Sequence, residues 1–428
     1  MTIPDGWLTV VGVEADGRLA DQTPLAGAAA ILGGARQLAL LGEPGGMDGP
    51  GGPERIAWPS PLRAGLADLL ADLRRRYGDR PVVALASGDP LLSGIGARLI
   101  DLLGADAVRI VPARSSVALA RARMGWPAEG CAVVSVVGRP LATVRRELAP
   151  GARLLVLSAD ETTPPALAAL LVEDGYGESR MTVLGDLGAA GESRRTQMAA
   201  DLIDDLAADR VADAPTPRLN IVAVECAGPL RVGWSAGLPD DVFEHDGQLT
   251  KRDLRASALA RLMPAPGQLL WDIGAGAGSV GIEWMRAHPR ARALAVEVDR
   301  TRAARIERNA ARLGVPGLRV VRGRAPAALE DLPADDTGPD AIFVGGGATA
   351  PGLLEACLAA LRPGGRLVVH GVTLETEALL AARYAELGGE LIRIGVEHGE
   401  PIGAAGRFHG WRPSRAVTSW SLTTSVAT

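Results

Sequence analysis

Three glycines at alternate positions, Gly274, Gly276 and Gly278, follow an apolar run within the stretch LLWDIGAGAGSVG, residues 269–281. Apolar residues resume at helical spacing from Val280, so the pattern predicts a strand, a tight glycine loop and a helix. Glycines let a ligand lie against bare main chain, and the start of a helix offers unpaired N–H groups and the positive end of its dipole. The stretch therefore favours binding of a nucleotide-like ligand or of its carboxylate.

The spacing of the glycines separates two kinds of nucleotide site. A dinucleotide site has the pattern G-x-G-x-x-G, but here the third glycine comes one residue before Ser279. Glu297 ends a second apolar run about twenty residues past the loop, where a carboxylate can hold a ribose diol. If only the glycines are considered, a plain turn would also explain them. With Asp272 and Glu297, however, the stretch resembles class I S-adenosylmethionine (SAM) methyltransferases, which implies SAM as the cofactor. The contacts so implied are Gly274, Ala275, Gly276, Ala277, Gly278 and Glu297.

Composition limits the class of protein. A chain of 428 residues exceeds what one core usually serves, so two or three domains are expected. The net charge of -5 argues against a nucleic-acid partner, and 3% aromatic residues argue against a base-stacking surface. No secretory signal and no apolar run of about 18 residues occurs, so we expect a cytoplasmic protein without a membrane partner. The three cysteines lack metal-ligand spacing, so no metal is expected.

The order of elements predicts two domains. Residues 81–86 and 108–111 are strands followed by glycine or serine loops, whereas residues 26–32 look helical and residues 37–41 look like a strand. Residues 226–238 lack periodicity and are rich in Gly and Pro, which indicates a linker and gives domains 1–230 and 231–428. In the second domain strands alternate with helices, which predicts a parallel sheet covered on both faces.

The first half resembles the tetrapyrrole methylases of cobalamin and sirohaem synthesis, which are class III SAM methyltransferases. The motifs are Ser87-Gly88-Asp89-Pro90 with Gly94-Ile95-Gly96, and Pro112 before Ser115-Ser116. The resemblance covers residues 7–226 and implies two α/β lobes, with Gly88, Asp89, Ser115 and Ser116 at the cofactor. Two departures are the first loop, residues 12–17, which lacks the family's G-x-G-P-G-D turn, and Val137, where related sequences carry histidine.

The second half resembles the decarboxylating precorrin methyltransferases that act on carbon 15. The motifs are at residues 237–240, 250–252, 271–276, 323–326 and 373–376. The first half resembles the partner enzyme for carbon 5. The whole chain therefore resembles the family of aerobic cobalamin synthesis in which these two enzymes are fused into one chain. This implies a class III α/β domain followed by a class I Rossmann-like, doubly wound α/β domain. It also implies methylation at carbons 5 and 15 with loss of carbon dioxide from an acetate arm, converting precorrin-6B to precorrin-8. Thr250, Gly323 and Ala325 match further cofactor positions.

A precorrin carries many carboxylates, so cationic side chains are expected around it. The candidates for substrate binding are Lys251, Arg252, Arg255, Arg407, Gly345 and Gly346, of which each cation could instead belong to a solvated face. Glu375 follows a predicted strand end, where open sheets place their sites, and is the candidate catalytic residue. Its alternative is a helix N-terminal acid. We also expect a homo-oligomer.

Two other functions fit parts of the pattern. One is a class I methyltransferase for RNA or protein with an added domain, which the acidic charge and the first half oppose. The other is a non-catalytic tetrapyrrole carrier or SAM sensor, which two cofactor loops oppose. The number of SAM molecules bound per chain would separate these hypotheses.

Overall fold

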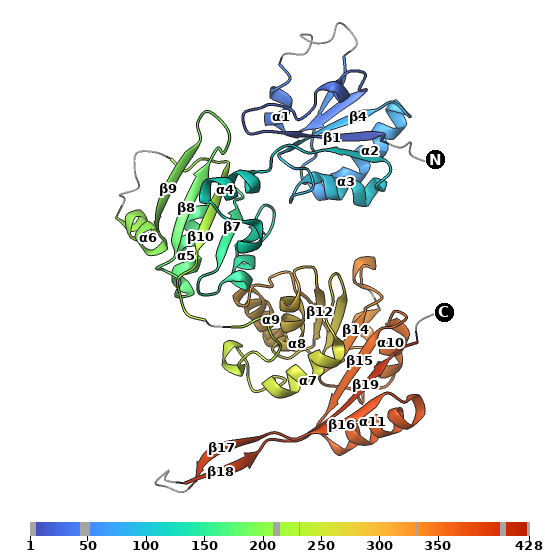
Figure 1. Cartoon of the computed structure of the whole chain (residues 1–428). Helices are drawn as coiled ribbons and strands as arrows, with labels where there is room; N and C mark the ends of the chain where they lie inside the picture. Colours follow the sequence, from blue (N-terminus) through green and yellow to red (C-terminus); the bar gives the residue numbers. More distant parts are fainter. Residues whose placement is uncertain are drawn as a thin grey trace. The chain divides into compact units, whose positions relative to one another are not determined.

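The computed structural model describes residues 6–42, 52–208, 215–230, 232–330, 332–402 and 408–425. By contact the chain divides into two compact units (Figure 1). The first is Met1–Leu141 with Ala149–Pro229, and the second is Leu230–Thr428 with Ala142–Leu148. Domains 1–230 and 231–428, as independently folding pieces, remain a prediction that fragment expression tests.

The first sheet of the first unit is parallel, with strand order β3-β2-β4-β1-β5. All six residues of β1 are buried, as expected for a central parallel strand covered on both faces. The strands are β1 (Leu8–Val13), β2 (Ala30–Gly33), β3 (Glu54–Ala57), β4 (Val82–Ser87) and β5 (Val108–Val111). The helices are α1 (Ala35–Ala39), α2 (Leu62–Tyr77) and α3 (Ile95–Leu103).

The assignments predicted for residues 26–32 and 37–41 are wrong. Residues 30–33 form β2, and residues 35–39 form helix α1. The four residues of β2 are all buried between β4 and β3, so tertiary pairing overrides the helical preference of an alanine-rich stretch.

The second sheet of the first unit is mixed, with order β6-β7-β10-β8-β9. β6 and β7 pair in parallel, whereas β10 is antiparallel to β7 and β8. The strands are β6 (Ala132–Ser135), β7 (Arg153–Leu157), β8 (Arg180–Gly185), β9 (Ser193–Met198) and β10 (Asn220–Glu225), and the helices are α4 (Ser116–Met124), α5 (Thr163–Glu173) and α6 (Ala199–Ala207).

The second unit has a seven-stranded sheet with order β13-β12-β11-β14-β15-β19-β16. The first five strands are parallel, and β19 runs antiparallel to both neighbours. The strands are β11 (Leu269–Ile273), β12 (Arg292–Glu297), β13 (Arg319–Arg322), β14 (Ala341–Val344), β15 (Arg366–Gly371), β16 (Glu390–Ile394) and β19 (Val417–Thr423). The helices are α7 (Arg252–Leu262), α8 (Ser279–Ala287), α9 (Arg300–Arg312), α10 (Leu353–Ala360) and α11 (Leu374–Leu387).

Two apolar layers enclose this sheet. One contains Leu259 of α7, Trp284 of α8 and Ile306 of α9. The other contains Leu354 of α10 and Leu380 of α11. The predicted doubly wound α/β fold is therefore confirmed. Strand order reverses between β11 and β14, and at such a point open sheets form a crevice beyond the carboxyl ends of the strands.

A two-stranded antiparallel ribbon, β17 (Glu397–Ile402) and β18 (Phe408–Pro413), connects β16 to β19. It projects from the end of the sheet in its unit (Figure 1). At its base, Ser414 N donates a hydrogen bond to Val396 O at 2.8 Å. This hydrogen bond joins the two segments where the ribbon meets β16 and β19. We call these segments, Val396 and Ser414 with their neighbours, the ribbon base.

Candidate functional site

A cavity of about 1110 Å³ opens at the carboxyl ends of the parallel strands of the second unit. Ligand pockets usually measure roughly 300–1000 Å³, so this cavity is large enough for a cofactor-sized ligand. Loops that follow β11, β12, β13, β14 and β15 all contribute to its lining, together with the ribbon base. The cavity thus lies at the topological switch point where the fold predicts a site.

The glycine loop forms part of the cavity wall. Gly276 has φ +59°, and a Cβ there would lie 2.8 Å from the carbonyl oxygen of Gln248. Gly276 must therefore be glycine for the preceding segment to pack against the loop. Gly274, Ala275 and Gly276 line the cavity, whereas Ala277 and Gly278 are absent from its lining.

Ala277 and Gly278, both expected at the cofactor, have supporting positions instead. Ala277 is fully buried, and its carbonyl accepts a hydrogen bond from Asn309 Nδ2 at 3.0 Å. Gly278 precedes α8 as its N-cap residue, and a Cβ on it would press on Ile306 at 2.7 Å. These two residues fix the loop against the helices behind it.

The Glu297 carboxylate lines the cavity although the residue is only 4% exposed. Its Oε2 accepts a hydrogen bond from Gly276 N and its Oε1 accepts one from Asp299 N, each at 2.9 Å. An ionised carboxylate has about four acceptor positions, so two remain for a ligand. Glu297 therefore connects the ends of β11 and β12 and can still hold a pair of hydroxyls.

Asp272 lies behind the loop and does not line the cavity. Its Oδ2 accepts a hydrogen bond from Gly281 N at 2.9 Å, which fixes the first turn of α8. Burial, with a smaller effect of the nearby Glu297 carboxylate, raises the pKa of the Asp272 carboxyl to about 7. Its role is to hold the loop and the helix together.

Other predicted residues also face the cavity. Thr250, Gly323 and Ala325 line it, as do Gly345 and Gly346 after β14. Lys251 lines it too, with Nζ 3.6 Å from Asp240 Oδ2. The structure therefore brings together residues from five separate loops, although a role for each of them in binding stays a prediction.

The two predicted arginines of α7 do not line the cavity. Arg255 is fully buried, where its guanidinium donates to Glu283, Asp240, Thr250 O and Leu238 O. Because all of its nitrogens are used inside the protein, Arg255 cannot bind substrate. Arg252 is exposed but outside the cavity lining. Arg407 lies outside the described residues.

Glu375, the candidate catalytic residue, lies outside the cavity lining on the exposed first turn of α11. Its own backbone N–H, followed by Thr373, lowers the pKa of its carboxyl. These are the contacts of a helix N-terminal acid, the alternative considered for this residue. The structure therefore gives Glu375 a structural position and no contact with the cavity.

Two cations in the cavity lining were missed. Arg324 and Arg415 both line the cavity and are exposed, and within the described ranges neither side chain forms an ion pair. Arg324 lies within the 323–326 motif that carries the family resemblance, and this position is the signal in the sequence that points to it. Arg415 precedes β19 in a stretch without periodicity, and nothing in the sequence pattern distinguishes it.

His370, at the end of β15, contributes to the cavity floor but is only 8% exposed. Burial, with a smaller effect of Arg261, lowers the pKa of the imidazole to about 4, so the ring is neutral at pH 7. Its ring meets that of Phe343 edge-on at 5.0 Å. The floor at this point therefore carries no charge.

In the first unit the predicted residues meet through their backbones. A Cβ on Gly88 would lie 3.3 Å from Ser115 Cα, so the loops after β4 and β5 are adjacent. Asp89 Oδ1 accepts from Leu91 N at 2.9 Å, and Ser115 Oγ caps α4 by accepting from Ala118 N at 3.1 Å. Ser116 is the first residue of α4. The side chains of Asp89 and Ser115 are thus both used in local hydrogen bonds to the main chain.

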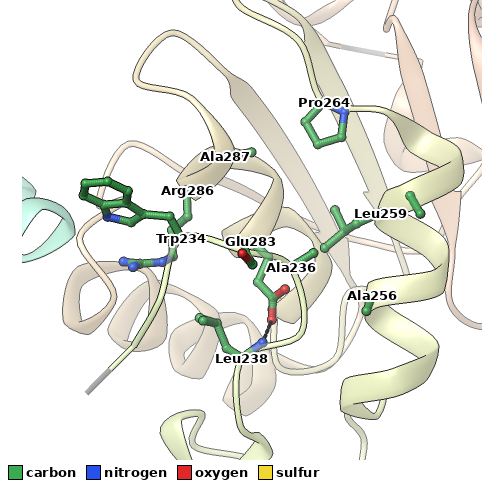
Figure 2. A pocket seen from close by; sticks show the side chains of 11 residues that line it. Trp234, Ala236, Leu238, Ala256, Leu259, Pro264, Glu283, Arg286 and Ala287 are labelled. Atoms are coloured by element: carbon green, nitrogen blue, oxygen red, sulfur yellow. Dashed lines mark hydrogen bonds between the residues drawn. The ribbon is translucent and has the colours of Figure 1, made fainter. Parts of the chain in front are cut away.

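A smaller, mainly apolar pocket of about 160 Å³ lies between α7, α8 and the segment that enters the second unit (Figure 2). Glu283 at its edge accepts hydrogen bonds from Gly237 N at 2.6 Å and Leu238 N at 2.9 Å. Both carboxylate oxygens are thus occupied within the protein. This pocket serves the attachment of the entry segment.

Comparisons with known proteins agree with this architecture. The family model for tetrapyrrole (corrin/porphyrin) methylases matches residues 60–202, and that for a precorrin methyltransferase domain matches residues 241–424. A precorrin-6Y C(5,15)-methyltransferase [decarboxylating] of Sinorhizobium sp. is 46% identical over 424 residues, covering 97% of this chain and 96% of the relative. The chain belongs to this family. It is therefore a methyltransferase of the decarboxylating precorrin-6Y C5,15 family, as its sequence motifs predicted.

Two shorter proteins match part of the chain. A relative from Pyrobaculum calidifontis, named as a probable cobalt-precorrin-6B C(15)-methyltransferase (decarboxylating), is 33% identical over 192 residues, covering 43% of this chain and 96% of the relative. The crystal structure of the C-terminal domain of precorrin-6Y C5,15-methyltransferase from Rhodobacter capsulatus is 43% identical and covers 45% of this chain and 99% of that chain, with a TM-score of 0.41. Within the described ranges, no helix is long and apolar enough to cross a membrane.

Proposed function

We propose that this precorrin methyltransferase uses SAM at two sites, one in each unit, and that the second unit also decarboxylates its substrate. It converts precorrin-6B to precorrin-8 by methylating carbon 5 in the first unit and carbon 15 in the second. The observation that carries the proposal is the cavity that joins a glycine loop, a buried carboxylate and exposed cations at one sheet edge. Cytoplasmic location and a homo-oligomeric state remain predictions.

The residues of the second unit fit SAM. The two free acceptor positions of Glu297 suit a ribose diol, and the loop at Gly274 and Gly276 exposes main chain toward the methionine end. Thr250, Gly323 and Ala325 complete the wall on that side. When bound, SAM supplies an electrophilic methyl group. The protein's task is to hold an electron-rich ring carbon in line with that methyl.

Decarboxylation is likewise a positioning task. The bond to the carboxylate must overlap the π system of the ring, which then accepts the electron pair as carbon dioxide leaves. The imidazole of His370 in the cavity floor is neutral, so its charge does not stabilise the carboxylate that leaves. The chain therefore needs to orient the acetate arm and to exclude water around it.

The relative from Pyrobaculum calidifontis supports placing both carbon-15 chemistry and decarboxylation in one unit. Its name joins these two reactions, while it matches only 43% of this chain. The motifs that resemble decarboxylating enzymes all lie after residue 236. Both reactions are therefore assigned to the second unit and its cavity.

The fragment 231–428, given SAM and precorrin-6B, is expected to yield a product heavier by one methyl and lighter by carbon dioxide. The fragment 1–230 should add one methyl only, because it lacks the second unit's cavity. Mass spectrometry of the products measures both changes, with circular dichroism of each fragment as the folding control. Release of carbon dioxide by fragment 1–230, with none from fragment 231–428, would contradict the assignment of decarboxylation to the second unit.

The full chain is expected to bind two molecules of SAM, because each unit is proposed to carry its own cofactor site. Isothermal titration calorimetry with SAM, or with the unreactive product S-adenosylhomocysteine, gives the stoichiometry directly. The opposing outcome is a chain that binds only one SAM, with an affinity that does not change when the Gly274–Gly276 loop is altered. That result would show that the second unit carries no cofactor site.

A further inference from the structure

The cavity has two ends with different linings. At one end Glu297 closes β12 and Arg324 follows β13, on the side assigned to the cofactor. At the other end the lining comes from the segment after β15 and from the ribbon base beside β19. The described residues at this second end are Val372, Thr373, Thr376, Val396, His398, Glu400, Arg412, Pro413, Ser414 and Arg415.

The pairing register of the ribbon explains which side chains face the cavity. His398 lies opposite Arg412, and Glu400 lies two residues further along β17. Directly opposite residues share a face of an antiparallel pair, and so do residues two apart on one strand. These three side chains therefore form one face, and all three line the cavity.

The charges at this end leave one cation available. Arg412 Nη1 is 2.9 Å from Glu400 Oε2, so this arginine is already paired. Lys251 and Arg302, elsewhere in the lining, pair with Asp240 and Asp246. Arg415 alone at this end combines an exposed guanidinium with no ion-pair partner in the part of the chain that the structure describes.

We propose that the ribbon base is the substrate wall of the cavity, with Arg415 binding a carboxylate of the tetrapyrrole; the proposal rests on the function proposed above. A guanidinium presents two parallel N–H donors that match a carboxylate, which fixes orientation as well as affinity. Glu400 repels a second carboxylate from its own position, so the wall distinguishes one edge of the macrocycle from another. Val372, which is 45% exposed, adds apolar surface to the lining at the same end of the cavity.

The test uses the full-length enzyme with precorrin-6B and saturating SAM, and follows carbon dioxide release, which reports on the second unit. Arg415→Gln is expected to raise KM for precorrin-6B about 10- to 100-fold, the effect of losing a charged hydrogen bond, with a smaller change in kcat. Arg415→Lys keeps the charge but loses the two-donor fork, so its KM should lie between those of wild type and Arg415→Gln.

Two further variants and one binding measurement complete the design. Glu400→Gln removes the repulsion and frees Arg412, so it should lower KM, a change of opposite sign. Arg393→Gln is the matched control, because Arg393 is an exposed arginine that pairs with Glu377 outside the cavity lining. Its KM should equal that of wild type. The Kd for SAM, measured by calorimetry, should be the same in Arg415→Gln and wild type.

An unchanged KM in Arg415→Gln, with active wild-type enzyme, would overturn the proposal and leave the proposed function standing. Equal weakening of SAM and precorrin binding would assign Arg415 to the cofactor and would also overturn it. If the wild-type enzyme released no carbon dioxide, the proposed function would fail. An absorbance titration of precorrin-6B binding to wild type and Arg415→Gln would then still decide whether Arg415 binds the tetrapyrrole.

Discussion

Replacing Arg255 by leucine is expected to destabilise the second unit by about 3–5 kcal/mol, the usual cost of removing one partner from a buried ion pair. The Glu283 side chain, which is 2% exposed, would be left in the interior without its cationic partner. Arg255 also donates to Asp240 Oδ1 at 3.2 Å and to two main-chain carbonyls. Its guanidinium lies 4.8 Å from the centre of the Phe243 ring.

These contacts connect α7 and α8 to the segment that leads into the second unit. Figure 2 shows the other half of the arrangement, with Glu283 directed at Leu238 N. Loss of Arg255 should therefore loosen residues 238–250 as well, including Thr250 at the cavity wall. The expected result is a variant with both lower stability and weaker ligand binding.

Urea-dependent proteolysis with mass spectrometry measures this effect, because it assigns each cleavage to one of the two units. Arg261→Leu is the matched control on the same helix. Arg261 pairs with Glu390 at 2.6 Å, but that carboxylate side chain is 53% exposed. Removing such a surface pair should cost roughly 1 kcal/mol or less. Equal destabilisation by the two substitutions would show that Arg255 does not hold a buried network.

Replacing Glu297 by alanine is expected to weaken SAM binding in the second unit by about 1–3 kcal/mol, the scale of a lost charged hydrogen bond. Two effects combine in this variant. The ribose would lose its acceptor, and Gly276 N would lose the carboxylate that holds the glycine loop in place. Since about 1.4 kcal/mol corresponds to a factor of ten, the affinity should fall by roughly 5- to 150-fold.

Calorimetry on the full chain can separate the two proposed cofactor sites, because only the second should weaken in Glu297→Ala. Glu297→Gln keeps one acceptor oxygen and should fall between alanine and wild type. Asp299→Asn is the control for charge, since Asp299 caps α9 by accepting from Arg302 N and asparagine retains such a cap. Unchanged affinity at both sites in Glu297→Ala would remove Glu297 from the cofactor site.

The sequence by itself determined the parts of this protein that depend on neighbouring residues. The alternation of strands and helices after residue 268, the glycine loop and the acid at the end of β12 all follow from local patterns. Parallel strands with crossovers leave few topologies, so the edge that carries the cavity could also be predicted. The family followed from several short motifs, and the comparisons confirm it.

Only the tertiary structure decided which charged side chains face the cavity. Lys251, Arg252 and Arg255 lie within five residues, yet Lys251 lines the cavity, Arg252 lies outside it and Arg255 is buried. Their environments depend on Glu283 and Asp240, which come from other segments. The sequence pattern of one short segment does not show which residues from other segments will pair with it.

The same reason applies to Arg415 and to β2. Arg415 reaches the cavity because β16, the ribbon and β19 return the chain to the sheet edge beside β15, a pairing between residues far apart in sequence. Residues 30–33 become a strand because β3 and β4 flank them on both sides. Long-range hydrogen bonding and burial decide these outcomes, and both are properties of the folded chain that no local pattern contains.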